Sequence, residues 1–402
     1  MNVNTMRAID YYAGVPLTFL STLLLKTRSL FSSKEYNYPR NTLLIELSEM
    51  GSAILVDPAM RKLQKQIDGE LFFVIFRSNR ASLKLLGTIK DENIFTIDES
   101  SMVALAVSTL KFFAWCRQKK IDSVIDLELF SRFTALLSGF CGASNRVGFH
   151  SFYNEGLYRG DLLTHKVAYN PHQHIAKNFI ALTDALVAQK EQTPYTKRVV
   201  EDSEITLAKC SITQSQQEAV SAKIGELYSD FTGSTQLILI NSNASDLLPE
   251  RRWDRKNYSE VIKMILANSN NALILLTGAP SEKDGAQELA DSVADKRCIN
   301  FAGEIEFLQL PHLYSISSFM ITNDSGPAHF AAITDMHTFV IFGPETPALY
   351  GSLGSSTPIY ANMSCSPCVS AANHRKTACD DNQCIQIITP QIVYNTIASR
   401  LS

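Results

Sequence analysis

The sequence lacks the charge excess and the motifs that mark several common protein classes. Its 402 residues include 37 Lys and Arg and 40 Asp and Glu, for a net charge of −3, whereas nucleic-acid-binding proteins usually carry a strongly basic face. No Gly-x-Gly-x-x-Gly follows an expected strand, which argues against a dinucleotide-dependent oxidoreductase. No Gly-Lys-Ser/Thr loop occurs, which argues against a P-loop kinase or ATPase. We therefore expect no nucleic-acid partner and neither of these enzyme classes.

Cysteine is too sparse for a disulfide-stabilised secreted domain. The chain has eight cysteines in 402 residues, of which four are scattered and four gather near the C-terminus. Secreted disulfide scaffolds are short and dense in cysteine. A reducing cytosol is therefore the expected compartment.

The chain also lacks a clear transmembrane run. The apolar stretch Tyr11–Leu25 is shorter and more interrupted than the roughly 20 apolar residues that a span needs, and no small-residue cleavage site follows it. Lys26 and Arg28 flank its far end. We expect residues 1–34 to form an amphipathic helix that lies on the inner leaflet of the membrane. A helix packed on the protein itself is the alternative, and a true span is a third.

The length suits two domains, because a single core rarely grows past about 250–300 residues. Short apolar runs alternate with helical patterns, which predicts an α/β fold of two doubly wound, Rossmann-like domains that face a central cleft. We expect the first domain at 35–190, a linker and entry helix at 191–235, the second domain at 236–388 and a C-terminal helix at 389–402. The expected strands are 41–47, 71–76, 93–96, 123–126 and 147–149, then 236–241, 272–277, 298–301, 319–322 and 338–342.

The most informative segment is a strand, turn and helix within residues 321–347. The strand is expected to end at Thr322, and the helix to begin near Pro327, a residue suited to a first helical position. Such a turn presents unsatisfied N–H groups and the positive end of a helix dipole, which favour an anion. An equally good interpretation of the local chemistry is that Asp324 only caps the helix and that His329 packs on the sheet. The residues of the expected anion site are Asp324, Ser325, Gly326 and His329.

The same segment resembles the nucleotide-binding signature of glycosyltransferase family 9, the bacterial heptosyltransferase family. Its members carry Asp-(Ser/Thr)-Gly-x-x-His, then Ala-Ala and Phe-Gly-Pro-(Thr)-x-Pro. This chain has Asp324-Ser-Gly-Pro-Ala-His329, Ala331-Ala332 and Phe342-Gly-Pro-Glu-Thr-Pro347. The resemblance implies a GT-B fold, in which Ser325 and Gly326 hold the diphosphate of a nucleotide sugar with His329 nearby.

A second resemblance follows the first strand of the C-terminal half. The segment Asn241–Trp253 is similar to a family segment with a basic residue just before Trp, so the diphosphate-binding base falls on Arg251 or Arg252; we favour Arg251. A guanidinium offers paired donors to phosphate oxygens. A solvated surface cluster is the alternative. The other expected donor-binding residues are Ser245, Thr277, Gly278 and Glu282.

A third resemblance covers the loop Leu47–Gly51, which is similar to a family loop beside the reacting centre. Many members read Ser-Ser-x-Gly-Asp there, and Ser52 stands where that Asp, the proposed general base, is expected. Serine is a poor proton acceptor without a base of its own, so Glu49 is the predicted replacement. The alternatives are that Glu49 only caps a helix, or that the protein is catalytically weak or inactive.

A polar, aromatic and basic stretch at residues 146–172 is similar to strings in a membrane-associated branch of the family. The resemblance implies that this stretch faces the acceptor. We expect the histidines of this stretch to serve in loops or as helix caps rather than as metal ligands. The expected acceptor-binding residues are Arg146, His150, Arg159 and His165.

The clustered cysteines match cysteine positions in many family members. Their spacing suits a tetrahedral thiolate site, for which zinc is the default metal. Reduced free thiols are the alternative, and disulfides or another cluster a third. The role is structural in each case, since the cluster lies beyond the Phe-Gly-Pro run. These residues are Cys365, Cys368, Cys379 and Cys384.

Together the resemblances imply an inverting, metal-independent glycosyltransferase. No Asp-x-Asp motif stands in a loop suited to a catalytic metal. Family analogy gives ADP-heptose as the donor, a lipopolysaccharide or other glycan as the acceptor, and the cytoplasmic face of the bacterial inner membrane as the location. Glu49 would deprotonate the acceptor, and Arg251 and Ser325 would stabilise the leaving diphosphate. A non-catalytic nucleotide-sugar-binding or scaffold protein of the same fold is the alternative.

Overall fold

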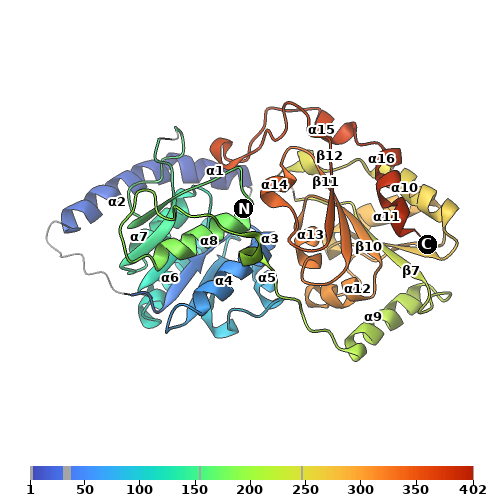
Figure 1. Cartoon of the computed structure of the whole chain (residues 1–402), viewed down its shortest axis with the longest axis horizontal. Helices are drawn as coiled ribbons and strands as arrows, with labels where there is room; N and C mark the ends of the chain where they lie inside the picture. The colour runs from blue at the N-terminus through green and yellow to red at the C-terminus, as the bar shows by residue number, and fades with distance from the viewer. Residues whose placement is uncertain (1–2, 30–37, 154, 246–247, 402) are drawn as a thin grey trace. The chain divides into compact units, whose positions relative to one another are not determined.

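The computed structural model describes residues 3–29, 38–153, 155–245 and 248–401 (Figure 1). The chain forms two compact units, Met1–Thr206 and Leu207–Ser402. Each unit is built on one six-stranded sheet whose neighbouring strands are all parallel. The expectation of two doubly wound α/β domains is therefore confirmed.

The first sheet has the strand order β3-β2-β1-β4-β5-β6. Its central strands are short runs in which every residue is buried, as expected for a parallel sheet covered on both faces. The order reverses between β1 and β4, so the loops that follow these two strands lead to opposite sides of the sheet. The strands are β1 Thr42–Ile45, β2 Leu71–Phe76, β3 Ile94–Ile97, β4 Ser123–Asp126, β5 Asn145–His150 and β6 His165–Ala168.

Helices cover both faces of this sheet. α4 and α8 pack side by side on one face (Figure 1), and right-handed crossovers place α6 and α7 on the other. Ser101 and Ser131 cap α6 and α7, since their hydroxyls accept the N–H groups of residues three positions later. The helices are α3 Met50–Leu55, α4 Asp57–Gln64, α5 Ala81–Lys84, α6 Met102–Gln118, α7 Arg132–Phe140 and α8 Ile175–Leu186.

Two short helices precede the first strand and belong structurally to the first unit. α1 (Val3–Tyr12) and α2 (Gly14–Ser29) pack against α7. Asp10 holds them there, because its carboxylate accepts the backbone N–H groups of Arg132 and Phe133 at 2.9 Å each and pairs with the Arg132 guanidinium at 3.2 Å. The residues between Leu30 and Asn37 lie outside the described part, so the separate segment expected at 1–34 is described only to Ser29.

α2 turns its polar side inward and its apolar side outward. Thr18, Ser21 and Thr22 are buried, and the Thr22 hydroxyl accepts the N–H of Asp161 at 2.8 Å. By length and composition alone, the stretch Thr5–Arg28 is long and apolar enough to cross a membrane, and 22% of its most apolar part is buried. The outward side chains, each 48–59% exposed, are Leu17, Phe19, Leu20, Leu23 and Leu24.

The second sheet has the order β12-β11-β10-β7-β8-β9 and reverses between β7 and β10. Trp253 and Tyr258, at the start of α10, are buried in its core. The strands are β7 Gln236–Asn241, β8 Ala272–Leu276, β9 Cys298–Asn300, β10 Phe319–Asn323, β11 His337–Phe342 and β12 Ser356–Tyr360. The helices are α9 Gln214–Leu227, α10 Arg255–Asn268, α11 Lys283–Val293, α12 Leu310–Ser315, α13 Gly326–Ala331, α14 Pro347–Tyr350, α15 Gln383–Gln386 and α16 Pro390–Ile397.

Both sheets end on an edge strand that the sequence analysis missed. The strand expected at 147–149 is not the last of its sheet, because β6 pairs with β5 beyond it. β12 likewise extends the second sheet beyond β11. Each of these strands keeps exposed or half-exposed residues and so lacks a continuous apolar run.

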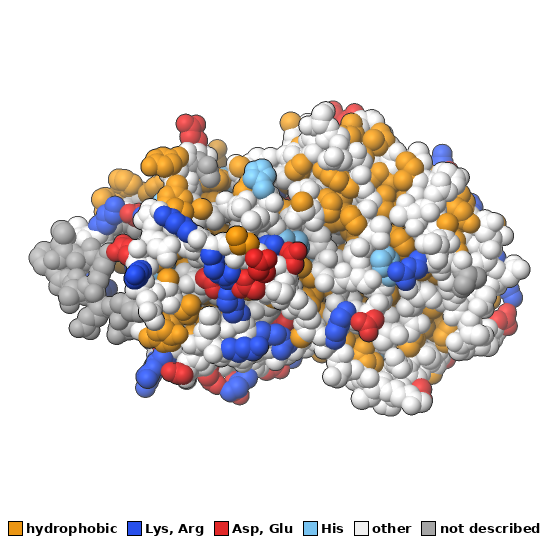
Figure 2. Space-filling model, in the orientation of Figure 1, with side chains coloured by type: hydrophobic (Ala, Val, Ile, Leu, Met, Phe, Trp, Pro, Cys, Tyr) orange, Lys and Arg blue, Asp and Glu red, His pale blue; other side chains and the backbone are white. Residues whose placement is uncertain are grey.

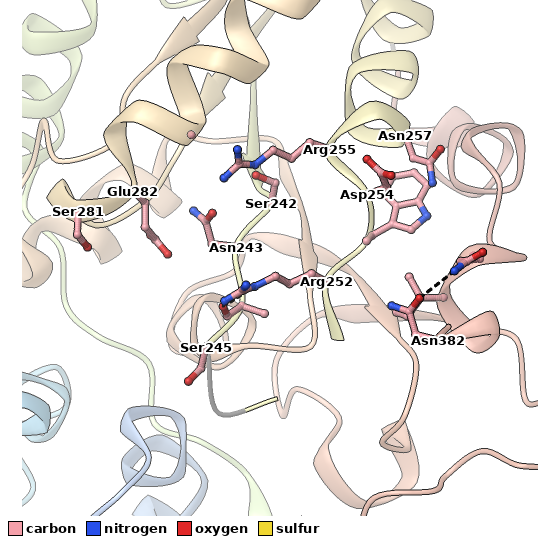
Figure 3. Close-up of a pocket in the computed structure, with 15 residues that line it drawn as sticks. Ser242, Asn243, Ser245, Arg252, Asp254, Arg255, Asn257, Ser281, Glu282 and Asn382 are labelled. Atoms are coloured by element: carbon pink, nitrogen blue, oxygen red, sulfur yellow. Dashed lines mark hydrogen bonds between the residues drawn. The ribbon is translucent and has the colours of Figure 1, made fainter. Parts of the chain in front are cut away.

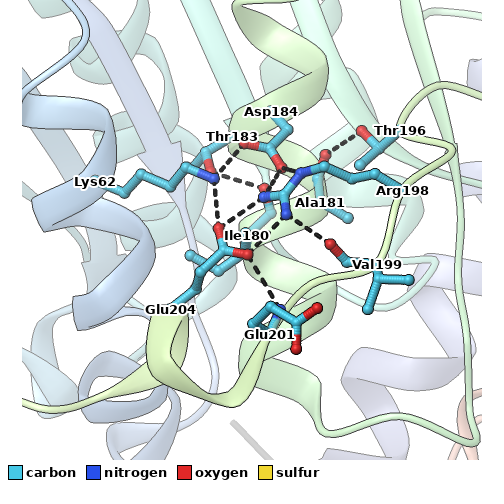
Figure 4. Close-up of polar contacts among 10 residues, drawn as sticks. All are labelled: Lys62, Ile180, Ala181, Thr183, Asp184, Thr196, Arg198, Val199, Glu201 and Glu204. Carbon is cyan, nitrogen blue, oxygen red and sulfur yellow. Dashed lines mark hydrogen bonds and ion pairs between the residues drawn. The ribbon is translucent and has the colours of Figure 1, made fainter.

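The expected linker at 191–235 divides between the two units, whose boundary falls at Thr206. Residues before it are tied to the first unit by an ion-pair network (Figure 4). Arg198 pairs with Asp184 and Glu204 at 2.7 Å each, and Lys62 of α4 pairs with Glu204 at 2.9 Å. On the face drawn in Figure 2, basic and acidic side chains of the first unit lie next to one another rather than in patches of one sign.

Candidate functional site

Four neighbouring strands of the second sheet end at one edge and bring the expected donor residues together. β8, β7, β10 and β11 are adjacent and parallel, so their carboxyl ends lie side by side. The loops that follow them begin at Thr277, Ser242, Asp324 and Gly343. In open α/β sheets, ligands bind outside the carboxyl ends where the strand order reverses, which here is between β7 and β10.

Asn323, the last residue of β10, joins these loops and was not expected as a site residue. Its side-chain Nδ2 donates to the carbonyl oxygen of Ser242 at 2.9 Å. Its Oδ1 accepts the Trp253 N–H at 3.1 Å and the Tyr258 hydroxyl at 3.0 Å. One fully buried amide therefore fixes the ends of β7 and β10 and the segment that carries Arg251.

Arg251 is the basic residue that lies at the Asp324 turn. It is 8% exposed, and its Nη1 lies 3.3 Å from Glu345 Oε2 and 3.8 Å from Asp324 Oδ2. Arg252 instead donates Nε and Nη2 to the carbonyl oxygen of Ala244, at 3.0 and 2.7 Å. The two arginines thus have different neighbours, and Arg251 is the one whose ion pairs in the described part of the chain include Asp324.

Glu345, in the Phe-Gly-Pro run, was also missed as a site residue. Its carboxylate is 1% exposed and lies between the guanidinium groups of Arg251 and Arg375. Burial, helped by the neighbouring Asp324 charge, raises the pKa of Glu345 to about 8, and burial raises the pKa of Asp324 as well. The two carboxyl groups therefore form a coupled pair that takes up a proton near neutral pH.

The turn after Asp324 is partly open to solvent. Ser325 occupies the N-cap position of α13 without a side-chain cap, and residues 325–327 are half-exposed. Asp324 therefore does not cap this helix, contrary to that alternative. Gly326 packs under the ring of Phe330, where a Cβ would approach ring carbons at 3.0 Å. His329 lies within α13 and is buried, with 8% of its surface exposed.

A polar pocket of about 970 Å³ lies beside this edge, next to the loop after β7 (Figure 3). Ser245, Arg252 and Glu282, three of the expected donor residues, line it. Arg252 and Arg255 extend toward Asn243 and Glu282 in the close-up. The pocket offers both cationic and amide groups, which suits a phosphorylated polar ligand.

The loop after β8 is shaped by two short contacts. Thr277 is buried and donates its N–H to the Ile240 carbonyl at 2.9 Å, which holds the loop against β7. Glu282 Oε2 accepts the Ala279 N–H at 2.7 Å. A Cβ on Gly278 would lie 2.9 Å from Glu282 Oε2, so glycine here lets this carboxylate approach the loop closely.

In the first unit, Glu49 and Ser52 lie together at the start of α3. Ser52 Oγ donates to Glu49 Oε2 at 3.4 Å. Glu49 occupies the N-cap position of α3, but its side chain makes no capping hydrogen bond. The alternative that Glu49 serves only as a cap is therefore not supported.

A further carboxylate beside this loop, Glu128, was missed. Its Oε1 accepts the N–H groups of Leu47 and Ser48 and the Ser48 hydroxyl, at 2.9, 3.2 and 2.7 Å. Burial raises the pKa of Glu128. The sequence could have indicated Glu128, because it follows the buried strand β4 by two residues and β4 lies next to β1 in the sheet.

Two of the expected acceptor residues are buried and engaged in internal contacts. Arg159 is 2% exposed and forms an ion pair with Asp126. His165 is 5% exposed on β6 and packs on Tyr195, and burial together with the Arg146 charge lowers the pKa of His165 to about 4. An acceptor role for these two is not supported by their exposure.

The other two expected acceptor residues are only partly covered. The Arg146 guanidinium donates to the carbonyl oxygens of Leu162 and Ala143, at 2.6 and 2.8 Å. His150 is half-buried and packs edge-on against Phe152. Arg146 is thus largely committed to loop carbonyls, and His150 is the more accessible of the two.

The clustered cysteines lie beyond the Phe-Gly-Pro run, and the expected zinc site stays a prediction. All four are free thiols, and among the described residues no three Cys, His, Asp or Glu side chains form a metal-binding group. Cys368 Sγ lies 3.5 Å from the Thr377 hydroxyl and Cys379 Sγ 3.4 Å from Asp381 Oδ1, whereas Cys384 is buried beside Gly343. Burial, together with the neighbouring Cys368, Cys379 and Cys365 thiols, raises the pKa of Cys384 to about 11, so the four cysteines belong to one neighbourhood.

The sequence is similar to that of known glycosyltransferases. The sequence model of glycosyltransferase family 9 (heptosyltransferase) matches residues 109–378, more than half of the chain. Lipopolysaccharide heptosyltransferase 2 of Salmonella typhimurium is 30% identical over 122 residues, which are 30% of this chain and 35% of the relative. The Escherichia coli protein of the same name is 29% identical over 101 residues, 25% of this chain and 29% of the relative. The chain thus aligns with about a third of the length of these relatives.

Solved structures share the fold. E. coli ADP-heptose heptosyltransferase II superposes with a TM-score of 0.66 at 18% identity, covering 90% of this chain and 98% of that one. E. coli heptosyltransferase WaaC with ADP superposes with a TM-score of 0.60 at 15% identity, and the match covers 90% of this chain and 99% of that one. These similarities confirm the GT-B α/β fold. Given the matched family model and the motifs gathered at the second sheet, the chain belongs to glycosyltransferase family 9.

Proposed function

We propose that this protein is a glycosyltransferase that moves a sugar from a nucleoside-diphosphate donor to a glycan acceptor. The observation that carries the proposal is Arg251, a buried guanidinium at the Asp324 turn. Its Nε has no hydrogen-bond partner among the described residues. A diphosphate would satisfy this group and neutralise its charge. Family membership and the heptosyltransferase relatives favour ADP-heptose as the donor and a lipopolysaccharide core as the acceptor.

The donor is proposed to lie along the carboxyl edge of the second sheet. The diphosphate would meet Arg251, Ser325 and Gly326, with His329 nearby. The nucleoside would occupy the adjacent pocket. Ser245, Arg252 and Glu282 line this pocket, and Thr277 and Gly278 would approach the donor from the loop that leads to Glu282.

The reaction is proposed to invert the anomeric centre. The acceptor oxygen attacks the anomeric carbon opposite the diphosphate, the bond from that carbon to the diphosphate oxygen breaks, and the acceptor proton passes to Glu49. Ser52 holds the Glu49 carboxylate through its hydroxyl. Arg251 and the N–H groups of the turn offset the charge that develops on the leaving diphosphate. The scheme routes no step through a divalent metal, so we expect turnover in the presence of EDTA.

The test has two parts. Thermal-shift measurements with ADP, GDP and UDP should show stabilisation, strongest with ADP, because a ligand that binds only the folded state raises its stability. Release of ADP from ADP-heptose should then depend on a lipopolysaccharide-core acceptor. Stabilisation by a nucleotide without acceptor-dependent release of ADP would favour a non-catalytic protein. This alternative is also suggested by Ser52, which replaces the Asp found in many family members. No stabilisation by any of the three nucleotides would overturn the proposal.

We also propose that the first unit works at the cytoplasmic face of the bacterial inner membrane. The outward face of α2 presents leucines and a phenylalanine to solvent while the helix buries its hydroxyls. Contact with lipid would cover this apolar face. Lys26 and Arg28, at the end of the helix, would meet anionic headgroups.

A further inference from the structure

The Glu345 carboxylate is held between two guanidinium groups that come from different loops. Arg375 Nε donates to Glu345 Oε1 and Arg375 Nη2 to Oε2, both at 3.1 Å. Arg251 Nη1 approaches the same Oε2 at 3.3 Å from the other loop. Glu345 and Arg375 are 1% and 15% exposed in their side chains, so the contact is shielded from water.

The charges around Arg251 create a conflict if this residue also binds a diphosphate. Asp324 and Glu345 both lie within 4 Å of its Nη1. Even with one proton bound, this pair of buried carboxyl groups carries one negative charge, which would cancel the single positive charge of Arg251. Arg375 supplies a second positive charge to Glu345 through a paired contact, which is the stronger geometry for an arginine and a carboxylate.

The loop that carries Arg375 is built to hold it against Glu345. The N–H groups of Cys368 and Val369 donate to the Pro344 carbonyl at 3.0 and 3.2 Å. His374 and Arg375 both adopt left-handed backbone conformations, with φ of 52° and 53°. Two consecutive residues other than glycine in this region are disfavoured and persist only where the surroundings hold them.

We propose that Arg375 is a positioning residue of the donor site. By neutralising Glu345, it leaves Arg251 with the positive charge and the unpartnered Nε that a nucleoside diphosphate needs. The proposal rests on the proposed function, since it takes Arg251 as a diphosphate ligand. It also gives the loop between Cys368 and Cys379 a role in donor binding.

The test compares ADP binding by calorimetry in the full-length wild type and in R375M, E345Q and R375M/E345Q. R375M should bind ADP about tenfold more weakly, because residues of one salt-bridge network usually influence each other by about this much. Adding E345Q to R375M should restore binding to near the wild-type level, because the uncompensated carboxylate is then gone. With a donor sugar, R375M should raise the KM for the donor and leave kcat nearly unchanged, since Arg375 touches no reacting atom.

Arg297 provides a matched control, because it is a partly buried arginine paired with Asp295 at 2.8 Å before β9. R297M should bind ADP as the wild type does. Equal ADP binding by R375M and the wild type, or a double variant as weak as R375M, would overturn the inference while leaving the proposed function intact. A wild type that does not bind ADP would defeat both. Should R375M not fold, the double variant carries the test, and a tenfold loss in it would overturn the inference.

Discussion

Asn323 accepts the backbone N–H of Trp253 on its Oδ1 at 3.1 Å, and this hydrogen bond links the end of β10 to the segment that carries Arg251. The same oxygen accepts the Tyr258 hydroxyl. The position of the proposed phosphate-binding arginine therefore depends on a buried amide that need not touch the ligand.

Replacing Asn323 by alanine should lower both stability and ADP affinity. Each buried group left without its partner costs about 1–3 kcal/mol, and Trp253 N–H and the Tyr258 hydroxyl would both be affected. Denaturant unfolding and ADP titration measure the two effects. N268A removes an exposed asparagine side chain on α10 and should change neither. Equal unfolding free energies for the two variants would contradict this assignment.

Replacing Glu49 by glutamine should reduce transfer by about 100-fold or more, the usual contribution of a general base, while ADP binding stays unchanged. S52A should have a smaller effect, because it removes only the hydroxyl that donates to Glu49. Steady-state turnover and ADP calorimetry separate the two quantities. If E49Q retains turnover and E128Q loses it, the base is Glu128, whose carboxylate lies beside the same loop.

The membrane proposal predicts that charge on the outward face of α2 prevents lipid binding. Wild-type protein should sediment with vesicles of phosphatidylethanolamine and phosphatidylglycerol, and L20E/L24E should not, since Leu20 and Leu24 are 59% and 58% exposed. L227E adds a charge at an exposed leucine of α9 in the second unit and serves as the control. Equal sedimentation of all three proteins would argue against α2 as the contact.

His165 should make the first unit sensitive to acid. Its pKa is lowered from 6.5 to about 4 in the folded state, so the unfolded chain takes up this proton first as pH falls. Above pH 6.5, His165 therefore does not lower the free energy of unfolding. Between pH 6.5 and 4, it lowers that free energy by up to about 3 kcal/mol. The unfolding free energy of H165Q should fall less over this window than that of the wild type. H172Q, at an exposed histidine, should follow the wild type; identical slopes for all three would refute the prediction.

The strands that position the site were predictable from the sequence, because residues buried on both faces of a parallel sheet must form continuous apolar runs. β2 and β7 are such runs. The edge strands β6 and β12 were not predictable in this way, since an edge strand with exposed residues carries no such pattern. The sequence also did not show that the expected linker is divided between the two units. That division depends on tertiary contacts, chiefly those of Arg198 with the first unit.

The order of residues in the chain determined which loops border the candidate donor site, because the carboxyl ends of adjacent parallel strands meet at one edge. Asp324 and Arg251 lie there, 3.8 Å apart. The chain order did not show that Glu345 lies between Arg251 and Arg375, which are 94 and 30 residues away from it. Only the folded chain brings these charges into contact. Local patterns determine elements, whereas the pairing of buried charges is decided by which loops the packed sheet places side by side.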